Sequence, residues 1–306
     1  MSSNKSVYSS QLNDRAILLQ FAKCKIGKKI ACKKCSWGRL KYWDERSFRC
    51  LRCWRRVSIT TGSWIESSRL PLRFWYEIAW SFVLAHSARK TGRLLEHPYK
   101  SVWSSYQKIR RVIVQNSEEY KEQITGTIEL DESFYGGTFK NLRKKIKAEF
   151  RRLGLNKRGG GAKYRKQPIF GIYKRNGKVF LELIPEAKAK ILLPIIKNRI
   201  KLGSNVFSDT ATPYTGLVGL GYVHRTVDHG KEEYVNGEVH INGMEGFWGL
   251  SKTNMHTYKG IKKKNWVFSI KEMEWRYNTR DLTFAEQVTE IMKLLMTYRK
   301  EIFVRS

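Results

Sequence analysis

Two Cys-x2-Cys pairs constrain this 306-residue chain more strongly than any other feature of its sequence. Cys32 and Cys35 form the first pair, Cys50 and Cys53 form the second, and fourteen residues separate them. Each pair sits on a tight turn, so the four sulfurs can surround one tetrahedral ion, and this spacing is typical of structural zinc sites. The sequence therefore predicts that these four cysteines bind one zinc ion.

The spacer between the pairs favours a short hairpin, which together with the metal makes a zinc ribbon. It contains four aromatic residues, Trp37, Tyr42, Trp43 and Phe48. A unit this small cannot bury a core alone, so the metal supplies much of its folding free energy. Four unliganded structural thiols are the alternative. Cys24 lies eight residues before the first pair and is not expected to be a ligand.

The charge balance indicates an acidic partner. The chain has 59 Lys and Arg against 27 Asp and Glu, a formal net charge of +32, and such a surplus repels itself in a compact protein. We expect nucleic acid and no membrane, because no apolar stretch approaches the roughly 20 residues of a membrane span and no signal peptide is recognisable. All cysteines lie between Cys24 and Cys53, which favours a reducing, intracellular compartment. A generally basic host proteome is the alternative explanation.

Residues 67–120 are predicted to form a helical domain that follows the zinc ribbon and its N-terminal extension, residues 1–66. Apolar residues recur at helical spacing from Leu70 to Ala88, and a short helix, a break at Glu96–Pro98 and a longer helix over Tyr99–Val114 follow. This order predicts a helix-turn-helix-like DNA-binding domain, whose last helix turns polar side chains toward DNA. These outward residues are Lys100, Ser101, Ser104, Ser105, Lys108 and Arg111. A helical linker with a solvated basic face is the alternative.

From residue 121 to residue 306 the chain is predicted to alternate strands and helices. The predicted strands are Thr127–Tyr135, Pro168–Lys174, Lys178–Ile184, Asn205–Ser208 and Tyr222–Val227. The predicted helices are Ala187–Leu202, His240–Met255, Lys264–Tyr277 and Phe284–Phe303. Asn176-Gly177 is a strong hairpin signal between the second and third strands. We expect an α/β domain with a mixed sheet and helices on its faces, and an RNase H-like order fits it.

A basic insertion, residues 138–166, separates the first two of these strands. It contains twelve Lys and Arg and one acid, Glu149. Such a segment cannot bury enough apolar surface to fold well alone. We expect a mobile loop that orders on the DNA backbone, with contacts from Lys144, Lys145, Arg151 and Arg152. A nuclear-localisation run or a solvated insertion is the alternative.

Three acidic residues are candidates for a second metal site. Asp131 lies within the first strand, where alternation puts Glu129, Asp131 and Ser133 on one face. Asp209 follows the fourth strand, and Glu245 lies in a predicted helix. If these elements meet at one sheet edge, the converging acids repel one another unless divalent cations lie between them. Two Mg²⁺ or Mn²⁺ ions about 3.5–4 Å apart could then activate an attacking hydroxyl and stabilise a leaving oxygen.

A lysine follows the last of these acids by two helical turns. Lys252 is seven residues after Glu245, so both side chains project from nearly the same helix face. A lysine at this position could pair with a DNA phosphate near the scissile bond. His240 and Asn242, just upstream, could support the site.

An ordered set of short motifs spans the chain from about Cys32 to Arg280. After the cysteine pairs come TTGSW (Thr60–Trp64), LPLRFW (Leu70–Trp75), IELDESFYGG (Ile128–Gly137), SDTATPYTGL (Ser208–Leu217) and HINGMEGFWGLSK (His240–Lys252). This set resembles the Merlin-type DDE transposases and their bacterial insertion-sequence relatives with an ISXO-type transposase domain. The resemblance implies an RNase H-like catalytic domain. It also implies that Asp131, Asp209 and Glu245 are the metal-binding acids and Lys252 the trailing basic residue.

The resemblance further implies a transposase that binds terminal inverted repeats, hydrolyses double-stranded DNA to a 3′ hydroxyl and joins that hydroxyl to target DNA. Because both element ends are cut together, we expect a homodimer or higher oligomer on DNA. It would work in the nucleus of a eukaryotic host or in the cytoplasm of a bacterial one. There are two alternatives. A catalytically inactive, element-derived protein would bind DNA without cleaving it, and a nuclease of the same fold would cleave without joining.

Overall fold

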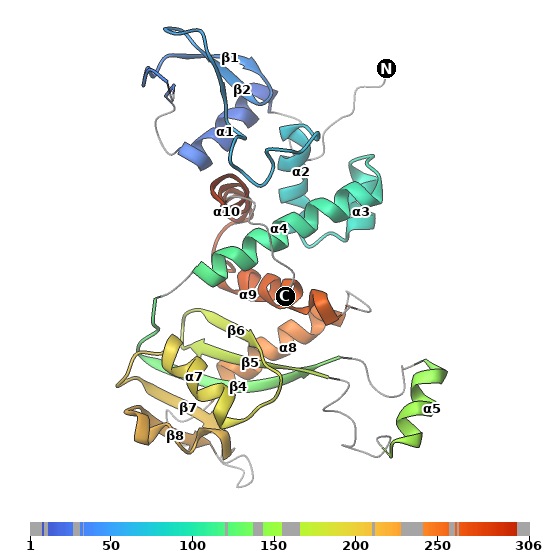
Figure 1. Ribbon diagram of the computed structural model, residues 1–306, viewed down its shortest axis with the longest axis vertical. Coiled ribbons are helices and arrows are strands. Elements are labelled where there is room, and N and C mark those ends of the chain that lie inside the picture. Colours follow the sequence, from blue (N-terminus) through green and yellow to red (C-terminus); the bar gives the residue numbers. More distant parts are fainter. Residues whose placement is uncertain are drawn as a thin grey trace. The chain divides into compact units, whose positions relative to one another are not determined.

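The computed structural model describes residues 8, 12–26, 31–32, 34–119, 122–136, 143–154, 166–209, 212–227, 241–256, 261 and 263–298. The chain divides into two compact units, one made of residues 1–119 with 279–306 and the other of residues 120–278. Figure 1 shows the small sheet and several helices of the first unit, and the larger sheet of the second. None of the helices in this described part has the length and apolar character that a membrane span requires.

A small antiparallel sheet follows the first cysteine pair. Its strands pair in the order β1 (Leu40–Asp44), β2 (Ser47–Cys50) and β3 (Arg56–Ser58). The hairpin predicted for the cysteine spacer is therefore confirmed, and β3 extends it. Phe48 and Val57, paired across β2 and β3, are buried, whereas Trp43 is exposed. The aromatic residues of the spacer thus do not all belong to a core.

The helices of the first unit include the predicted short helix, break and longer helix. They are α1 (Asp14–Ile26), α2 (Leu72–Val83), α3 (Ala88–Leu94), α4 (Tyr99–Glu119) and α10 (Phe284–Thr297). The Ser87 side chain caps α3 by accepting a bond from the Lys90 N–H, and Glu96 adopts a positive φ of 53° at the break. A Cβ on Gly92 would lie 2.9 Å from the His97 carbonyl oxygen, so glycine permits this tight turn.

The burial of α4 follows its predicted apolar stripe with one exception. Its buried apolar residues include Val102, Tyr106, Ile109, Val112 and Ile113. Ser105, which we predicted to face outward, is also buried, and its hydroxyl donates to the Ser101 carbonyl. A serine that bonds its own helix in this way needs no water, so burial costs little.

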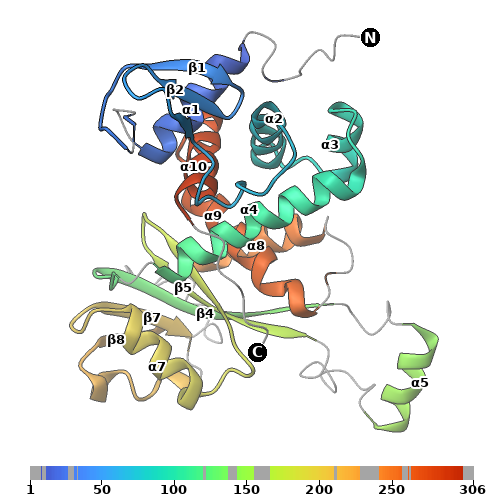
Figure 2. The same cartoon turned by 45° about the horizontal axis from the view of Figure 1, so that its top comes forward.

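Two helices of the first unit differ from expectation. α1 has no counterpart among the predicted elements, although four of its apolar residues are buried. α10, predicted as part of a domain over residues 121–306, belongs to the first unit and packs against α1, α2 and α4 (Figure 2). Its buried face includes Val288, Ile291 and Leu295, and the Leu295 carbonyl accepts a bond from the Trp64 N–H. Apolar complementarity with distant helices therefore decides where this helix lies.

The second unit contains a mixed sheet, as predicted. Its strands are β4 (Thr127–Tyr135), β5 (Gln167–Lys174), β6 (Val179–Leu183), β7 (Asn205–Asp209) and β8 (Val223–Val227). They pair in the order β6-β5-β4-β7-β8. β5 runs antiparallel to both β4 and β6, whereas β7 runs parallel to β4 and to β8. Asn176, with a φ of 54°, turns the chain between β5 and β6 as its Asn-Gly signal predicts.

Helices cover both faces of this sheet (Figure 1). They are α7 (Ala189–Arg199), α8 (Asn242–His256) and α9 (Trp266–Asn278), with the short 3-10 helices η2 (Thr212–Tyr214), η3 (Val218–Leu220) and η5 (Lys263–Asn265). On one face, Leu130 and Ile172 pack with Leu192 of α7. On the other face, Ile169 packs with Met244 of α8 and Ile270 of α9. The unit is thus a layered α/β fold.

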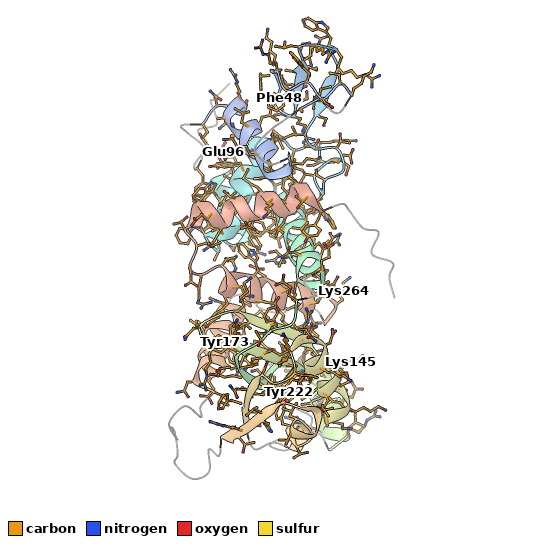
Figure 3. All side chains as sticks on the ribbon, turned by 90° about the vertical axis from the view of Figure 1, so that its left-hand side faces the viewer. Phe48, Glu96, Lys145, Tyr173, Tyr222 and Lys264 are labelled. Atoms are coloured by element: carbon orange, nitrogen blue, oxygen red, sulfur yellow. The ribbon has the colours of Figure 1, made fainter. Side chains whose placement is uncertain are left out.

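Part of the basic insertion is helical, which differs from the loop that we predicted. α5 (Lys144–Arg152) begins after Arg143 and buries none of its side chains. Lys145, labelled in Figure 3, lies on this helix. Lys, Ala, Glu and Arg have high helix propensity, so a local helix can form even where composition provides no core. The rest of the insertion, residues 137–142 and 155–165, lies outside the described residues.

Side chains of α9 protect the edge strand β6. Asn278 accepts a bond from the Val179 N–H at 2.8 Å and donates to the Val179 carbonyl at 2.8 Å. Two residues along, Glu274 accepts from the Leu181 N–H and Lys271 donates to the Leu181 carbonyl, both at 2.7 Å. Bonds at every second residue occupy the positions that another strand would use, so α9 blocks pairing at this edge.

The close packing of α8 against the sheet depends on two glycines. A Cβ on Gly171 of β5 would lie 2.7 Å from Cζ2 of Trp248. A Cβ on Gly243 of α8 would lie 2.6 Å from Cδ1 of Tyr173 and 3.0 Å from a carboxylate oxygen of Glu129. Real Cβ atoms do not approach rigid rings this closely, so a larger residue at either position would push the helix away from β4 and β5.

Gly243→Ala is expected to destabilise the second unit by about 1–3 kcal/mol, because the new methyl group overlaps the Tyr173 ring. Gly249→Ala is the matched control on the same helix. Nothing lies within 4 Å of its Cβ, so we expect a gain of up to about 1 kcal/mol from helix propensity. Urea unfolding followed by circular dichroism measures both changes. Equal stability of the two variants would contradict the close packing of α8.

Candidate functional site

Asp131 lies on the face of β4 that α8 covers. The side chains of Glu129 and Asp131 both contact this helix: Glu129 accepts a bond from the Met244 N–H, and Asp131 accepts one from the Trp248 indole, each at 2.9 Å. The alternation that the sequence predicts for β4 is therefore observed. The second oxygen of Asp131 accepts a bond from the Glu132 N–H at 2.8 Å. Two neutral donors thus fix the plane of this carboxylate.

Asp209 is the last residue of β7, the strand that runs parallel to β4. Phe207 pairs with Glu129, and the Arg175 guanidinium that bonds Glu129 also lies 4.5 Å from the Phe207 ring centre. Phe207 therefore lies on the same face as Glu129. Asp209 is two residues further along, so its side chain projects from the face that carries Asp131.

Glu245 lies in the first turn of α8, as predicted, and its side chain is exposed. The bond from the Met244 N–H to Glu129 holds the start of this helix against β4. One turn later, Trp248 is buried among Tyr135, Phe247 and other apolar residues, and its indole reaches Asp131. Trp248 and Phe247 are core residues, and the hydrogen bond from Trp248 to Asp131 has no signal in the sequence.

The pKa of Asp131 indicates that the three acids interact electrostatically. Burial is the main cause that raises the pKa of Asp131 to about 6, and repulsion from Asp209 and Glu245 adds to it. The Glu132 N–H and the Trp248 indole oppose this shift. The oxygens of the three carboxylates nevertheless do not all lie within 4.8 Å of one another. Among the described residues, the four cysteines are the group of possible metal ligands that lies this close together.

Lys252 is exposed on α8, two turns after Glu245. Its position on the helix agrees with the predicted spacing, and its predicted role in phosphate binding stays a prediction. Asn242 is the first residue of α8 and is exposed. His240 lies outside the described residues.

Two further pairs lie close to the acids and have no signal in the sequence. Glu132 accepts a bond from the buried Tyr214 hydroxyl at 2.7 Å, and burial raises the pKa of Glu132 to about 7. Ser208 bonds the Nε2 atom of His224 across the β7–β8 pair at 2.9 Å. The Tyr214 bond ties the 3-10 helix after Asp209 to β4, so it helps to hold the segment that carries Asp209.

The four predicted zinc ligands are brought together. Their sulfurs lie within 4.8 Å of one another, with Cys32 and Cys53 at 3.5 Å and Cys35 and Cys50 at 3.6 Å. Backbone N–H groups of Cys35 and Lys34 lower the pKa of Cys32 to about 6, and those of Cys53 and Arg52 lower the pKa of Cys50. The Trp37 N–H also lowers the pKa of Cys35, but burial and the neighbouring sulfurs outweigh it and raise this pKa to about 11. Thiolates stabilised by N–H donors are the ligands that zinc requires, so this cluster could hold a structural zinc ion.

The predicted DNA-contacting residues lie on two helices. Lys100 and Arg111 are exposed on α4, and Lys144, Lys145, Arg151 and Arg152 are exposed on α5. Lys108 is half-buried, with its ammonium 5.3 Å from the centre of the Trp75 ring. This contact engages Lys108 within its own unit, so Lys108 is less available to a ligand than we predicted.

We expect about one zinc ion per chain in the purified protein, and its removal by a strong chelator should unfold the β1–β3 sheet. Cys50→Ser should lose most of the zinc because a tetrahedral site then lacks one sulfur. Cys24→Ser is the matched control, since its thiol lies 3.8 Å from the Thr289 carbonyl oxygen and outside the cluster. Atomic emission measures the stoichiometry. Full zinc content in Cys50→Ser would refute the ligand set.

The raised pKa of Asp131 predicts how stability depends on pH in the absence of divalent cations. In the folded chain Asp131 keeps its proton up to about pH 6, whereas an unfolded aspartate releases it near 3.8. The folded state therefore binds more protons between these values, and wild type loses stability relative to Asp131→Asn as the pH rises through that window. Urea unfolding of both proteins across the window measures the difference. A difference that does not change with pH would contradict the burial of this acid.

Comparison with known proteins agrees with this architecture. Residues 123–278, which are just over half of the chain and contain the three acids, match the ISXO2-like transposase domain family. An uncharacterized transposase-like protein of Haemophilus influenzae is 30% identical over 105 residues, which are 34% of this chain and 85% of that protein. An uncharacterized protein in the transposable element ISH50 of Halobacterium salinarum is 26% identical over 234 residues, covering 73% of this chain and 76% of its own. The chain therefore belongs to the ISXO2-like transposase family.

Proposed function

We propose that this protein is an active DNA transposase that cleaves DNA at element ends and joins the new 3′ hydroxyl to target DNA. The observation that carries this proposal is the arrangement of Asp131, Asp209 and Glu245. They come from one sheet face and from the helix seated on it, and all three act on one electrostatic site. The strand order β6-β5-β4-β7-β8, with three antiparallel strands followed by two parallel ones, supports an RNase H-like fold.

The donor set fits hard divalent cations. The site offers carboxylate oxygens from three elements, and the two hydrogen-bond donors to Asp131 are neutral. Mg²⁺ or Mn²⁺ would neutralise the negative charge of these carboxylates. Asp131, Asp209 and Glu245 would hold two such ions. When bound, they would activate the attacking hydroxyl and stabilise the leaving oxygen of an in-line displacement.

Other residues of the site act by orientation and charge. The Trp248 indole and the Glu132 N–H hold the Asp131 carboxylate in one plane, which preorganises it as a ligand. Lys252, exposed on the same helix as Glu245, would pair with a phosphate beside the scissile bond. Positioning of the DNA backbone against the acids would lower the barrier to displacement.

Double-stranded DNA is the proposed partner. The net charge of +32 favours an anionic partner, and the first unit combines a cysteine cluster with the α3–α4 helix pair. Lys100 and Arg111 on α4 and the four exposed basic residues of α5 would contact phosphates of terminal repeats and target DNA. Joining two element ends would require a dimer or higher oligomer on the DNA.

Strand transfer in vitro tests the proposal, with Mg²⁺ and DNA that carries the element's own ends. We expect wild type to give joined products. Asp131→Asn, Asp209→Asn and Glu245→Gln should each lower the rate by about 100- to 1,000-fold or more, as for loss of one electrostatic group at a reaction centre. Asp281→Asn is the matched control, since that acid is 84% exposed and lies outside the site. Gel analysis separates joined, cleaved and intact DNA.

The products also separate the alternatives. Cleaved DNA without joined products would identify a nuclease, and DNA binding without cleavage in Mg²⁺ or Mn²⁺ would identify an inactive element-derived protein. Wild-type rates in Asp131→Asn would sink the assigned mechanism whatever the products.

A further inference from the structure

A row of cations crosses the small sheet of the first unit. Lys41 of β1 pairs directly with Arg49 of β2, and Arg49 pairs directly with Arg56 of β3. Like charges that face each other across strands destabilise a sheet. Asp44 offsets part of this repulsion through a 2.6 Å contact with Arg56. The remaining excess of positive charge calls for an anion from outside the sheet.

Two tryptophans lie beside this row and are open to solvent. Trp43 is 52% exposed and Trp54 is 62% exposed. The Arg49 guanidinium lies 4.3 Å from the centre of the Trp43 ring and 5.4 Å from that of Trp54. Phe48, labelled in Figure 3, belongs to the buried face of the same sheet. Apolar side chains of this size are normally buried, so two exposed indoles on a basic face suggest a ligand with flat rings.

The backbone at Trp54 strengthens this argument. Trp54 follows Cys53 and has a φ of 57°, and Ser36, at the matching position after Cys35, has a φ of 54°. Glycine adopts this left-handed conformation freely, whereas a bulky side chain pays for it in steric strain. A tryptophan at a position that favours glycine, with most of its surface exposed, gains no core packing in return. Strain of this kind is a mark of functional positions.

We propose that Lys41, Trp43, Arg49, Trp54 and Arg56, the Trp–Arg face, bind unpaired nucleotides of DNA. The indoles would stack on bases while the row of cations contacts the phosphates of the same strand. This inference rests on the proposed function insofar as it takes DNA as the partner. It adds that the ribbon recognises single-stranded segments, such as the flanks of a cleaved or opened element end.

Unpaired DNA fits the Trp–Arg face better than duplex DNA does. In a duplex both faces of each base are covered by its neighbours, so an indole has no ring to stack on. Phosphate contacts alone would require the arginines and would leave Trp43 and Trp54 without a role. Stacking on either indole is also tolerant of sequence, because every base has a flat face.

Binding to a labelled oligodeoxythymidine strand, compared with a blunt-ended duplex of two complementary strands, tests this proposal. The zinc-loaded full-length protein is used at one fixed salt concentration, because phosphate contacts depend on salt. Trp43→Ala and Trp54→Gly should each weaken binding to the single strand by about 5- to 100-fold and leave duplex binding unchanged. Trp43→Tyr should restore most of the loss because it keeps an aromatic face. Fluorescence anisotropy measures both ligands.

Two controls separate stacking from folding. Trp54→Gly relieves the strain at its positive φ, so its zinc content and thermal stability should equal or exceed those of wild type. Phe284→Ala removes an aromatic side chain that is 56% exposed on α10 and should leave both affinities unchanged.

Unchanged single-strand binding in Trp43→Ala and Trp54→Gly overturns the proposal, and so does an equal loss for single strand and duplex. In either case strand transfer by wild type leaves the proposed function intact. A wild-type protein that neither binds nor cleaves duplex DNA contradicts the proposed function itself, whatever these variants do.

Discussion

The buried carboxylate of Glu129 is the contact on which the candidate active site depends. It is fully buried on β4, where it accepts bonds from the Arg175 guanidinium at 2.8 Å and from the Met244 N–H at 2.9 Å. A buried charge without partners costs several kcal/mol, so this acid requires both the guanidinium and the positive end of α8. The bond fixes the start of α8, and Glu245 and Trp248 follow at set positions on that helix.

Glu129 and Asp131 are two residues apart on one face of one strand, yet their surroundings differ. Glu129 has a guanidinium and a helix N-terminus, whereas the donors to Asp131 are an indole and a backbone N–H. Burial, and to a lesser extent the neighbouring acids, therefore raise the pKa of Asp131. Glu129 holds the helix in place, and Asp131 is the acid to which we assign metal binding under the proposed function. Such a difference in surroundings distinguishes an acid with a structural role from an acid with a reactive one.

Local signals account for most of the secondary structure. Asn176-Gly177 and the apolar periodicity of α4 each act within a few residues, and the predicted strands of the α/β unit and most of its helices are present. The placement of α10 with α1, α2 and α4 could not be predicted, since the sequence shows that the helix has an apolar face but not which helices cover it. The burial of Ser105 and the helix within the basic insertion also depend on bonds and propensities that composition does not reveal.

The sequence by itself identified the four cysteines that the fold brings together, the excess of positive charge, and the three acids of the candidate site, because spacing and residue type are local properties. Tertiary structure decided which side chains surround them. Gly171 and Gly243 let α8 approach the sheet, Trp248 then reaches Asp131, and Tyr214 reaches Glu132 from 82 residues away along the chain. The fold likewise leaves Trp43 and Trp54 exposed beside Arg49, although both side chains are apolar. Hydrophobicity predicts burial on average, but which apolar residues stay outside depends on how many elements are available to cover them.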